Sequence, residues 1–282
     1  MKPCVLFILL LACSWESAVS QYYYKDILGS LETCAKELHY RQNKVHQVIV
    51  HSYAPDGTED TDFVCNQTLN RDFSRMETVT SAPATGNSLL TSYYDDSSRL
   101  IRTVDSNASA VTTTEYVYTS SGFPGSVVSR STANNPDSSW TNSEEQHLWQ
   151  YGPGGQPTGM FRIMGARDTT YVRFKSDAQG DITDEISTRH GLEVEHYFYY
   201  YDATNHLTDI LHFNHKIQGM MPDYSFVYDE SGRLHQMTVT QTIGGNYLIW
   251  LYAYDDNGLR IKEVCYDKDK ELVGSLGYRY VQ

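Results

Sequence analysis

The chain has 282 residues, of which 40% are hydrophobic and 20% are charged, and this composition excludes an intrinsically disordered protein. The formal net charge is −13, and an acidic surface repels phosphate backbones and anionic lipid headgroups. Nucleic-acid binding and electrostatic docking on a membrane are therefore not expected. The 23 tyrosines favour pleated, half-buried surfaces over helical packing.

Residues 1–20 are predicted to be a secretory leader. The apolar run at 4–12 is too short to span a bilayer but is typical of a signal peptide. Two processing routes remain open. The sequence Ala-Val-Ser at 18–20 suits signal peptidase, whereas Leu-Leu-Ala-Cys at 10–13 is similar to a bacterial lipobox and would leave a lipidated Cys13. We expect an exported protein, in the periplasm, on the outer-membrane surface or secreted, with no membrane contact beyond such a lipid.

Three cysteines follow the leader: Cys34, Cys65 and Cys265. An odd number allows one disulfide and one free thiol, and Cys34 with Cys65 is the pair nearest in sequence. The alternative is three separate buried thiols that act as small hydrophobic side chains. The chain has no Cys-x-x-Cys motif, so a zinc site is not expected.

Residues 21–43 are predicted to form an N-terminal segment with one helix at 22–43. Ser30 is a possible cap, and Leu31, Cys34, Ala35 and Leu38 recur at helical spacing. This apolar stripe predicts a helix that docks against a sheet and closes one end of it.

Residues 44–282 are predicted to form a single domain of β-hairpins. Turn signals recur every 8 to 13 residues, and no helical pattern separates the strands, which indicates antiparallel pairing throughout. The expected fold class is therefore all-β: a long antiparallel meander of roughly 16 strands, curled by its twist into an open barrel-like or sandwich sheet.

A repeated pattern dominates the last third of this domain. Aromatic strands end in Tyr201-Asp202, Tyr228-Asp229 and Tyr254-Asp255, which lie 27 and 26 residues apart. Each is followed by a short turn and a leucine, at Leu207, Leu234 and Leu259, and Tyr94-Asp95 with Leu100 is an earlier copy.

The repeat has a structural interpretation. An aspartate at the end of a strand can accept hydrogen bonds from the backbone of the turn that it opens. Gly232, Gly258 and Asn205 are residues that tolerate positive φ within such turns. The tyrosine and leucine are expected to pack across the strand pair.

In these motifs the chain resembles the YD-repeat (Rhs-like) proteins of bacterial cell surfaces. Gly232-Arg233-Leu234 fits the family pattern best, whereas His206 departs from it. The resemblance covers about a third of the chain. The overall organisation is also similar to that of short, uncharacterised exported proteins of Gram-negative envelopes, some of which are thought to form porin-like barrels. It implies β-hairpins outside the cytoplasm and no catalytic residues.

Sites for chemistry are weak. His212 and His215 lie three apart in a predicted strand and would point to opposite faces, so no metal or other cofactor is expected. Glu193 and Glu195, two apart and so on one face, and the pair Asp184-Glu185 are candidates for glycoside hydrolysis. Acidic residues near turns are usually only solvated, and no catalytic function is expected.

Aromatic side chains are the better indication of binding. Trp140, Trp149 and Trp250, with the tyrosines, are candidates for a stacking platform for a glycan or a partner protein. Two motifs, Asn66-Gln67-Thr68 and Asn107-Ala108-Ser109, match the pattern for N-glycosylation, and in a bacterial context we expect these matches to have no meaning.

Together these observations predict an exported or lipid-anchored envelope protein, not an enzyme, with a structural role or a role in binding a protein or glycan. The alternatives are a polysaccharide hydrolase that uses carboxylates and a porin-like outer-membrane barrel. Charges within predicted strands, at Arg189, Glu193, Lys262 and Glu263, argue against the barrel.

Overall fold

The computed structural model describes residues 22–83, 85–135, 142–165, 168–214, 218–241 and 246–282. Within these residues the chain forms one helix and 18 strands. The helix is α1 (Lys25–Gln42), and the strands in chain order are β1 (Gln47–Tyr53), β2 (Val64–Leu69), β3 (Arg75–Ala82), β4 (Gly86–Tyr94), β5 (Leu100–Asn107), β6 (Ala110–Tyr118), β7 (Pro124–Ala133), β8 (Asn142–Tyr151), β9 (Pro157–Met164), β10 (Asp168–Ser176), β11 (Ile182–Arg189), β12 (Leu192–Tyr201), β13 (Leu207–Asn214), β14 (Gly219–Tyr228), β15 (Leu234–Thr240), β16 (Tyr247–Tyr254), β17 (Arg260–Asp267) and β18 (Leu272–Val281).

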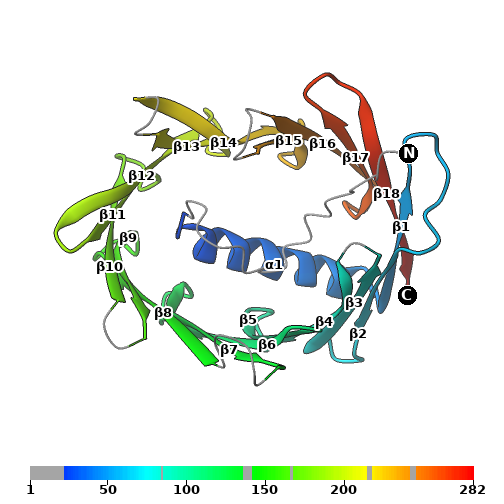
Figure 1. Cartoon of the computed structure of the whole chain (residues 1–282), viewed down its shortest axis with the longest axis horizontal. Helices are drawn as coiled ribbons and strands as arrows, with labels where there is room; N and C mark the ends of the chain where they lie inside the picture. Colours follow the sequence, from blue (N-terminus) through cyan, green and yellow to red (C-terminus); the bar gives the residue numbers. More distant parts are fainter. Residues whose placement is uncertain (1–21, 84, 136–141, 166–167, 215–217, 242–245) are drawn as a thin grey trace.

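The strands close into a barrel (Figure 1). Each strand pairs antiparallel with the next along the chain, and β1 pairs with both β2 and β18. The closing pair is in register from Gln47 opposite Val281 to Tyr53 opposite Ser275. The prediction of an all-β fold with one short helix is confirmed. The prediction of an open or sandwich sheet is wrong, because pairing β1 with β18 satisfies the edge groups that an open sheet would expose.

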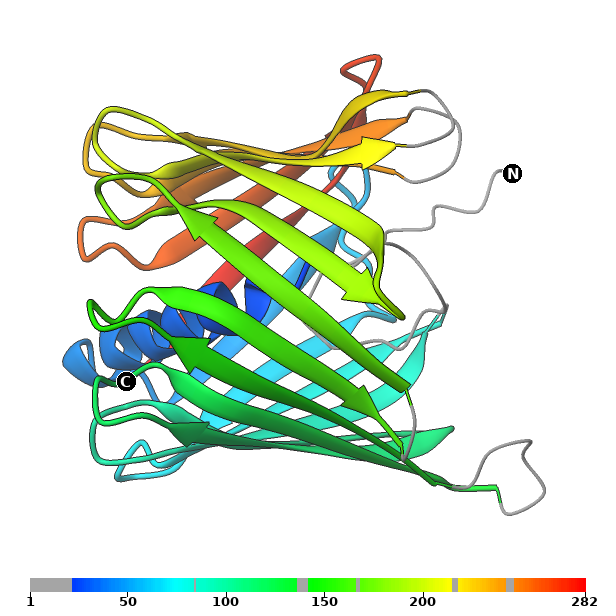
Figure 2. The ribbon, with the colours of Figure 1, turned by 90° about the vertical axis from the view of Figure 1, so that its left-hand side faces the viewer.

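The helix lies inside the barrel (Figures 1 and 2). Near its C-terminal end, Tyr40 belongs to a core cluster with Val48, Cys65 and Met76 on the inner face of the wall. Near its N-terminal end, Ile27 packs in a second cluster with inner-face residues of β8 to β13. The prediction that the helix closes one end of a sheet is therefore corrected, since α1 fills part of the lumen.

The face that the helix buries also differs from the prediction. Ile27, Ser30, Glu37 and Tyr40 are the buried positions, whereas Leu31 and Leu38 are 51% and 38% exposed. Hydrophobic periodicity alone misled because the buried face includes two polar residues with partners in the helix itself: the Ser30 hydroxyl donates to the carbonyl of Ile27, and Glu37 pairs with Arg41. The helix begins at Lys25, with Tyr24 as the N-cap residue, and Ser30 is not its cap.

Alternation along the strands separates an inner face from an outer face. In β10, Val172 and Phe174 are buried and face the lumen, while their neighbours Tyr171 and Arg173 are exposed. The inner face thus acts as the hydrophobic core of the protein, as in an antiparallel sheet that packs one face on its core.

We predict that Val172→Ala, at a fully buried inner position, lowers the free energy of unfolding by about 2 kcal/mol, because it removes two methyl groups and leaves a cavity. The matched change Val117→Ala, at an outer position that is 61% exposed, should alter it by no more than about 0.5 kcal/mol. Denaturant unfolding measures both. Equal losses would contradict the assignment of the inner face as the core.

Candidate functional site

The Tyr-Asp motifs lie in a series of turns along one end of the barrel, which we call the Tyr-Asp rim (left in Figure 2). In every turn of this rim, the first residue donates its N–H to the carbonyl of the fifth. The fourth residue donates its N–H to the carbonyl of the first. Turns of this form occupy residues 95–99, 119–123, 152–156, 177–181, 202–206, 229–233 and 255–259. The repeat therefore extends well beyond the three strong copies in the sequence.

The aspartates of the motifs hold these turns. Oδ1 of Asp229 accepts hydrogen bonds from the backbone N–H groups of Ser231 and Arg233, both at 2.9 Å. Asp202, Asp255 and Asp95 accept from the equivalent pairs of N–H groups. Hydrogen bonds from the backbone of His206 and from Thr204 lower the pKa of Asp202 to about 2. The turn hydrogen bonds thus hold the Asp202 carboxylate in its ionised form.

The fourth position of each turn adopts positive φ. Gly232 and Gly258 have φ of 75° and 79°, and Asn205 has φ of 69°. Glycine adopts this conformation at no steric cost, and asparagine is among the residues that tolerate it best. The same position is Ser98 in the first turn, with φ of 61°.

Five tyrosines around the rim connect their hairpin to the one before it, whereas Tyr94 and Tyr201 make no such bond. Tyr228 lies opposite Leu234 in its own hairpin, but its hydroxyl donates to the carbonyl of Leu207 in the preceding hairpin at 2.9 Å. The same bond recurs around the rim, from Tyr118 to Leu100, Tyr151 to Pro124, Tyr254 to Leu234 and Tyr280 to Arg260. Each of these carbonyls belongs to the residue directly after a rim turn. The tyrosine hydroxyls therefore link neighbouring turns through hydrogen bonds.

Flat side chains at the fifth turn position complete this contact. His206 stacks on Tyr228 with 4.5 Å between the ring centroids, and Arg233 lies 5.0 Å from the centroid of the Tyr254 ring. Arg99 and Phe123 lie in the same way against Tyr118 and Tyr151. His206, the departure from the family pattern, therefore occupies a position that accepts any planar side chain.

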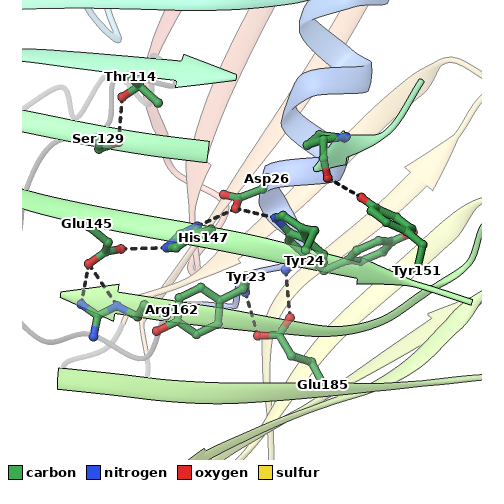
Figure 3. A network of polar contacts seen from close by, with 12 residues as sticks. Tyr23, Tyr24, Asp26, Thr114, Ser129, Glu145, His147, Tyr151, Arg162 and Glu185 are labelled. Carbon is green, nitrogen blue, oxygen red and sulfur yellow. Dashed lines mark hydrogen bonds and ion pairs between the residues drawn. The ribbon is translucent and has the colours of Figure 1, made fainter. Parts of the chain in front are cut away.

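A second polar site holds the start of the helix (Figure 3). Glu185 is fully buried on the inner face of β11 and accepts the backbone N–H groups of Tyr23 and Tyr24 at 2.7 and 2.9 Å. It also accepts the hydroxyl of Tyr199 at 2.7 Å. The wall thus supplies the helix cap that the chain before the helix lacks. Burial raises the pKa of Glu185 to about 7, against the effect of these three donors.

A chain of ionic contacts lies beside this cap. Asp26 of the helix meets Nδ1 of His147 at 2.6 Å, and Nε2 of His147 meets Glu145 at 2.9 Å. Arg162 then donates two hydrogen bonds to Glu145. Burial alone would lower the pKa of His147, but Asp26 and Glu145 raise it to about 9. Burial opposes ionisation of Glu145, but His147 and Arg162 lower its pKa to about 2.

We call Asp26, Glu145, His147, Arg162 and Glu185 the lumenal anchor. Its acceptor atoms are largely occupied by donors of the protein itself, and its contacts run between the helix and the wall. The arrangement suits attachment of the helix better than attack on a bound substrate, because a general acid or base must reach the substrate.

The paired carboxylates that the sequence suggested are not brought together. Asp184 lies on the outer face, where Lys175 and His196 contact it at 3.0 and 2.9 Å, whereas Glu185 points inward. A β-bulge between Glu193 and Glu195 also breaks the expected alternation, so Glu193 contacts His196 on the outer face. The prediction that Glu193 and Glu195 share one face is wrong, because a bulge inserts one residue.

The other predicted groups have local partners. His212 contacts Asp223 at 2.9 Å, and His215 lies outside the described residues. The described residues contain no cluster of three or more His, Cys, Asp or Glu that could hold a metal ion. Trp149 and Trp250 are 7% and 3% exposed, so neither offers an exposed stacking face.

The cysteines are separate thiols. Cys34 is half-buried on the helix, while Cys65 and Cys265 are buried in the wall, and all three are free. The possible disulfide between Cys34 and Cys65 is thus not formed. Trp140, Cys13 and the predicted leader at residues 1–20 lie outside the described residues.

Comparisons with known proteins give remote likenesses. No family model and no curated protein matches the chain. A porin-like protein from Bacteroides uniformis matches with a TM-score of 0.41 and 8% identity over 84% of this chain and 96% of that protein. The Photorhabdus luminescens Tc holotoxin pore matches with a TM-score of 0.30 and 12% identity over 86% of this chain. A TcdB2–TccC3–Cdc42 structure has a TM-score of 0.31 and 12% identity over 84% of this chain.

The chain spans only 17% of the length of the two toxin chains. Among the described residues, the one helix is not long and apolar enough to cross a membrane.

We predict that Tyr228→Phe lowers the free energy of unfolding by about 1 kcal/mol, because the carbonyl of Leu207 loses its hydroxyl donor while the ring packing remains. The control is Tyr200→Phe, on the opposite strand face and 49% exposed, which should have little effect. Urea unfolding of both variants provides the measurement. An unchanged free energy of unfolding in Tyr228→Phe would refute the stabilising role of this hydrogen bond between turns.

We predict that the lumenal anchor makes stability depend on pH. The pKa of His147 is raised in the folded state. Its contribution to the free energy of unfolding is therefore complete below about pH 6.5 and disappears as pH rises through about 9. The shift corresponds to a contribution on the order of 3 kcal/mol. Glu145 has a lowered pKa, so its contribution holds above its unfolded pKa and is lost as pH falls toward 2.

His147→Asn should therefore destabilise the protein at pH 6 and much less at pH 9.5. Unfolding free energies at both pH values test this, with His235→Asn at an exposed position as the control. A loss that is the same at both pH values would show that the charge of His147 is not involved.

Proposed function

We propose that this chain is an exported, non-enzymatic β-barrel whose outer wall meets water and whose lumen is occupied by its own helix, with a structural or partner-binding role in the cell envelope or outside the cell. The observation that carries the proposal is the distribution of charge and apolar surface between the two faces of the wall.

The outer face carries ionic groups on neighbouring strands. Arg130 of β7 contacts Glu115 of β6 and Glu144 of β8, each at 2.7 Å, with about half of each side chain exposed. Lys175, Asp184 and His196 form a similar row across β10 to β12. A lipid-facing wall would instead present a continuous apolar band at these positions.

The inner face carries the core. The clusters around Val48 and around Met160 pack against the helix, and the helix is fastened by the lumenal anchor. A polar, water-filled pore has the reverse pattern, with polar groups inside and apolar groups outside. This pattern supports the water-facing barrel over the porin-like alternative.

Of the charged residues within predicted strands, three lie where water reaches them. Arg189, Glu193 and Lys262 are exposed, whereas Glu263 is a buried lumenal residue that pairs with Arg260 and accepts the hydroxyl of Tyr278. The first three add to the ionic character of the outer surface.

The helix offers a binding surface within the lumen. Leu31, Glu32, Ala35, Lys36 and Leu38 are exposed although the helix lies inside the barrel (Figure 1). Solvent therefore reaches this face of the helix. A contiguous exposed apolar patch with a polar rim is typical of a surface that meets a partner. We propose this face as the place where a peptide or glycan would bind.

The hydrolase alternative receives less support. The inner carboxylates Asp26, Glu145 and Glu185 contact donors of the protein itself. In each of the two carboxylate pairs suggested by the sequence, the two members lie on different faces of the wall. Glycoside hydrolysis needs two carboxylates that flank one substrate bond.

We predict that the full chain, exported by a bacterial host, is processed and partitions into the aqueous phase of Triton X-114. An ionic outer wall gives detergent no continuous apolar surface to cover. Partition into the detergent phase that Cys13→Ala abolishes would indicate a lipid anchor on a water-facing barrel. Partition into detergent that persists in Cys13→Ala would overturn the proposed water-facing wall.

A further inference from the structure

Two Asn-x-Ser/Thr motifs lie at different kinds of place in the barrel. Asn66 is in the middle of β2, between Ile49 of β1 and Val79 of β3, and is half-buried. The next residue, Gln67, is buried and accepts the hydroxyl of Tyr40 from the helix. This motif is therefore part of the wall and of the helix contact.

Asn107 is the last residue of β5, and Ala108 and Ser109 form the turn that leads to β6; all three residues are exposed. Strand β5 starts at the Tyr-Asp rim, so this turn lies at the opposite end of the barrel (right in Figure 2). The motif lies entirely at this connection, and none of its three side chains belongs to a core cluster.

The asparagine is held in a defined conformation. Its Oδ1 accepts the backbone N–H of Ser109 at 2.9 Å and that of Ala110 at 3.1 Å, and Asn134 donates to its carbonyl at 2.8 Å. Such an Asx turn uses the side-chain oxygen. The nitrogen, Nδ2, is the atom that an N-linked glycan modifies, so the turn and the modification use different atoms of Asn107.

We propose that Asn107 is an acceptor for an N-linked oligosaccharide. The inference rests on the proposed export, because the transfer takes place outside the cytoplasm. Nδ2 forms a bond to the anomeric carbon of a polyprenyl-pyrophosphate-linked oligosaccharide. The bond between that carbon and the pyrophosphate oxygen breaks, the polyprenyl pyrophosphate leaves with the electron pair, and one amide proton passes to a base of the transferase. No oxidation or reduction occurs.

The residue two positions before the asparagine also distinguishes the motifs. Asp105 stands before Asn107, whereas Val64 stands before Asn66. Asp105 is half-buried in β5, and a cationic side chain of a transferase would recognise its carboxylate through a charge-assisted hydrogen bond. Asn107 thus has a nearby carboxylate for such recognition, and Asn66 has none at the same place.

A glycan at Asn107 would leave the rest of the molecule unchanged. The turn is remote from the Tyr-Asp rim, and Nδ2 is not used by the two turn hydrogen bonds. The added oligosaccharide would solvate the end of the barrel opposite the rim and mark that end as exposed to water.

The test expresses the full chain in a eukaryotic secretory host and in a bacterial periplasm that holds an oligosaccharyltransferase. Exported protein is examined for a mobility shift and by mass spectrometry of the peptide that contains Asn107. The variant Ser109→Ala removes the hydroxyl of the motif but keeps both backbone N–H donors to Asn107, so the turn is preserved. Ser109→Thr restores the motif, and Asn66→Gln removes the other one.

We expect a glycan on Asn107 that Ser109→Ala abolishes, that Ser109→Thr restores and that Asn66→Gln leaves in place. Asp105→Asn should abolish the glycan on Asn107 only in the bacterial host. This difference between the hosts would show which type of transferase depends on the Asp105 carboxylate. Exported protein with Asn107 unmodified in both hosts overturns the inference while the proposed function stands. Failure of export in both hosts counts against the proposed function itself.

Discussion

The pairing of β1 with β18 is the constraint on which the rest of the structure depends. A strand at the edge of a sheet leaves a row of unpaired N–H and C=O groups, and the closing pair removes both edges at once. Closure also creates an interior that has to be filled. The chain fills it with α1 and with inward side chains of the wall, such as Val48, Met160 and Tyr197. The helix is thus a core element of the barrel.

The Tyr-Asp rim is the local unit that keeps so many hairpins in register. Each aspartate fixes its own turn, and tyrosine hydroxyls such as those of Tyr228 and Tyr254 donate to the residue after the turn of the preceding hairpin. Register shifts occur at the same place in each unit, as between Val227 and Tyr228 or Ala253 and Tyr254. Bulges increase local twist and bending, which a sheet needs in order to close. The repeated residues are therefore engaged in architecture.

Polar groups inside the barrel have a different role from those outside. Glu185 and His147 are buried and meet the helix, so they determine where it sits. Arg130 and its partners are half-exposed, and ion pairs of that kind contribute little to stability. The inner contacts are worth more because the alternative is an unpaired polar group in a largely dry site.

The sequence by itself determined the local structure. Asp229 and Gly232 define their turn through short-range hydrogen bonds and backbone geometry, and the alternation in strands such as β10 is visible in the residue order. Closure of the barrel could not be predicted from the sequence, because it depends on a pairing between residues 47–53 and 275–281, which are far apart along the chain.

The candidate site divides in the same way. The rim aspartates were identifiable from spacing, but Glu185 became the helix cap only through a contact across 162 residues. One bulge moved Glu193 away from Glu195, since a single extra residue reverses every side chain beyond it. The exposure of Leu31 and the separation of Cys34 from Cys65 were likewise decided by tertiary structure, because both depend on where the helix lies against the closed wall. The burial of Trp250 depends on packing between neighbouring strands of that wall.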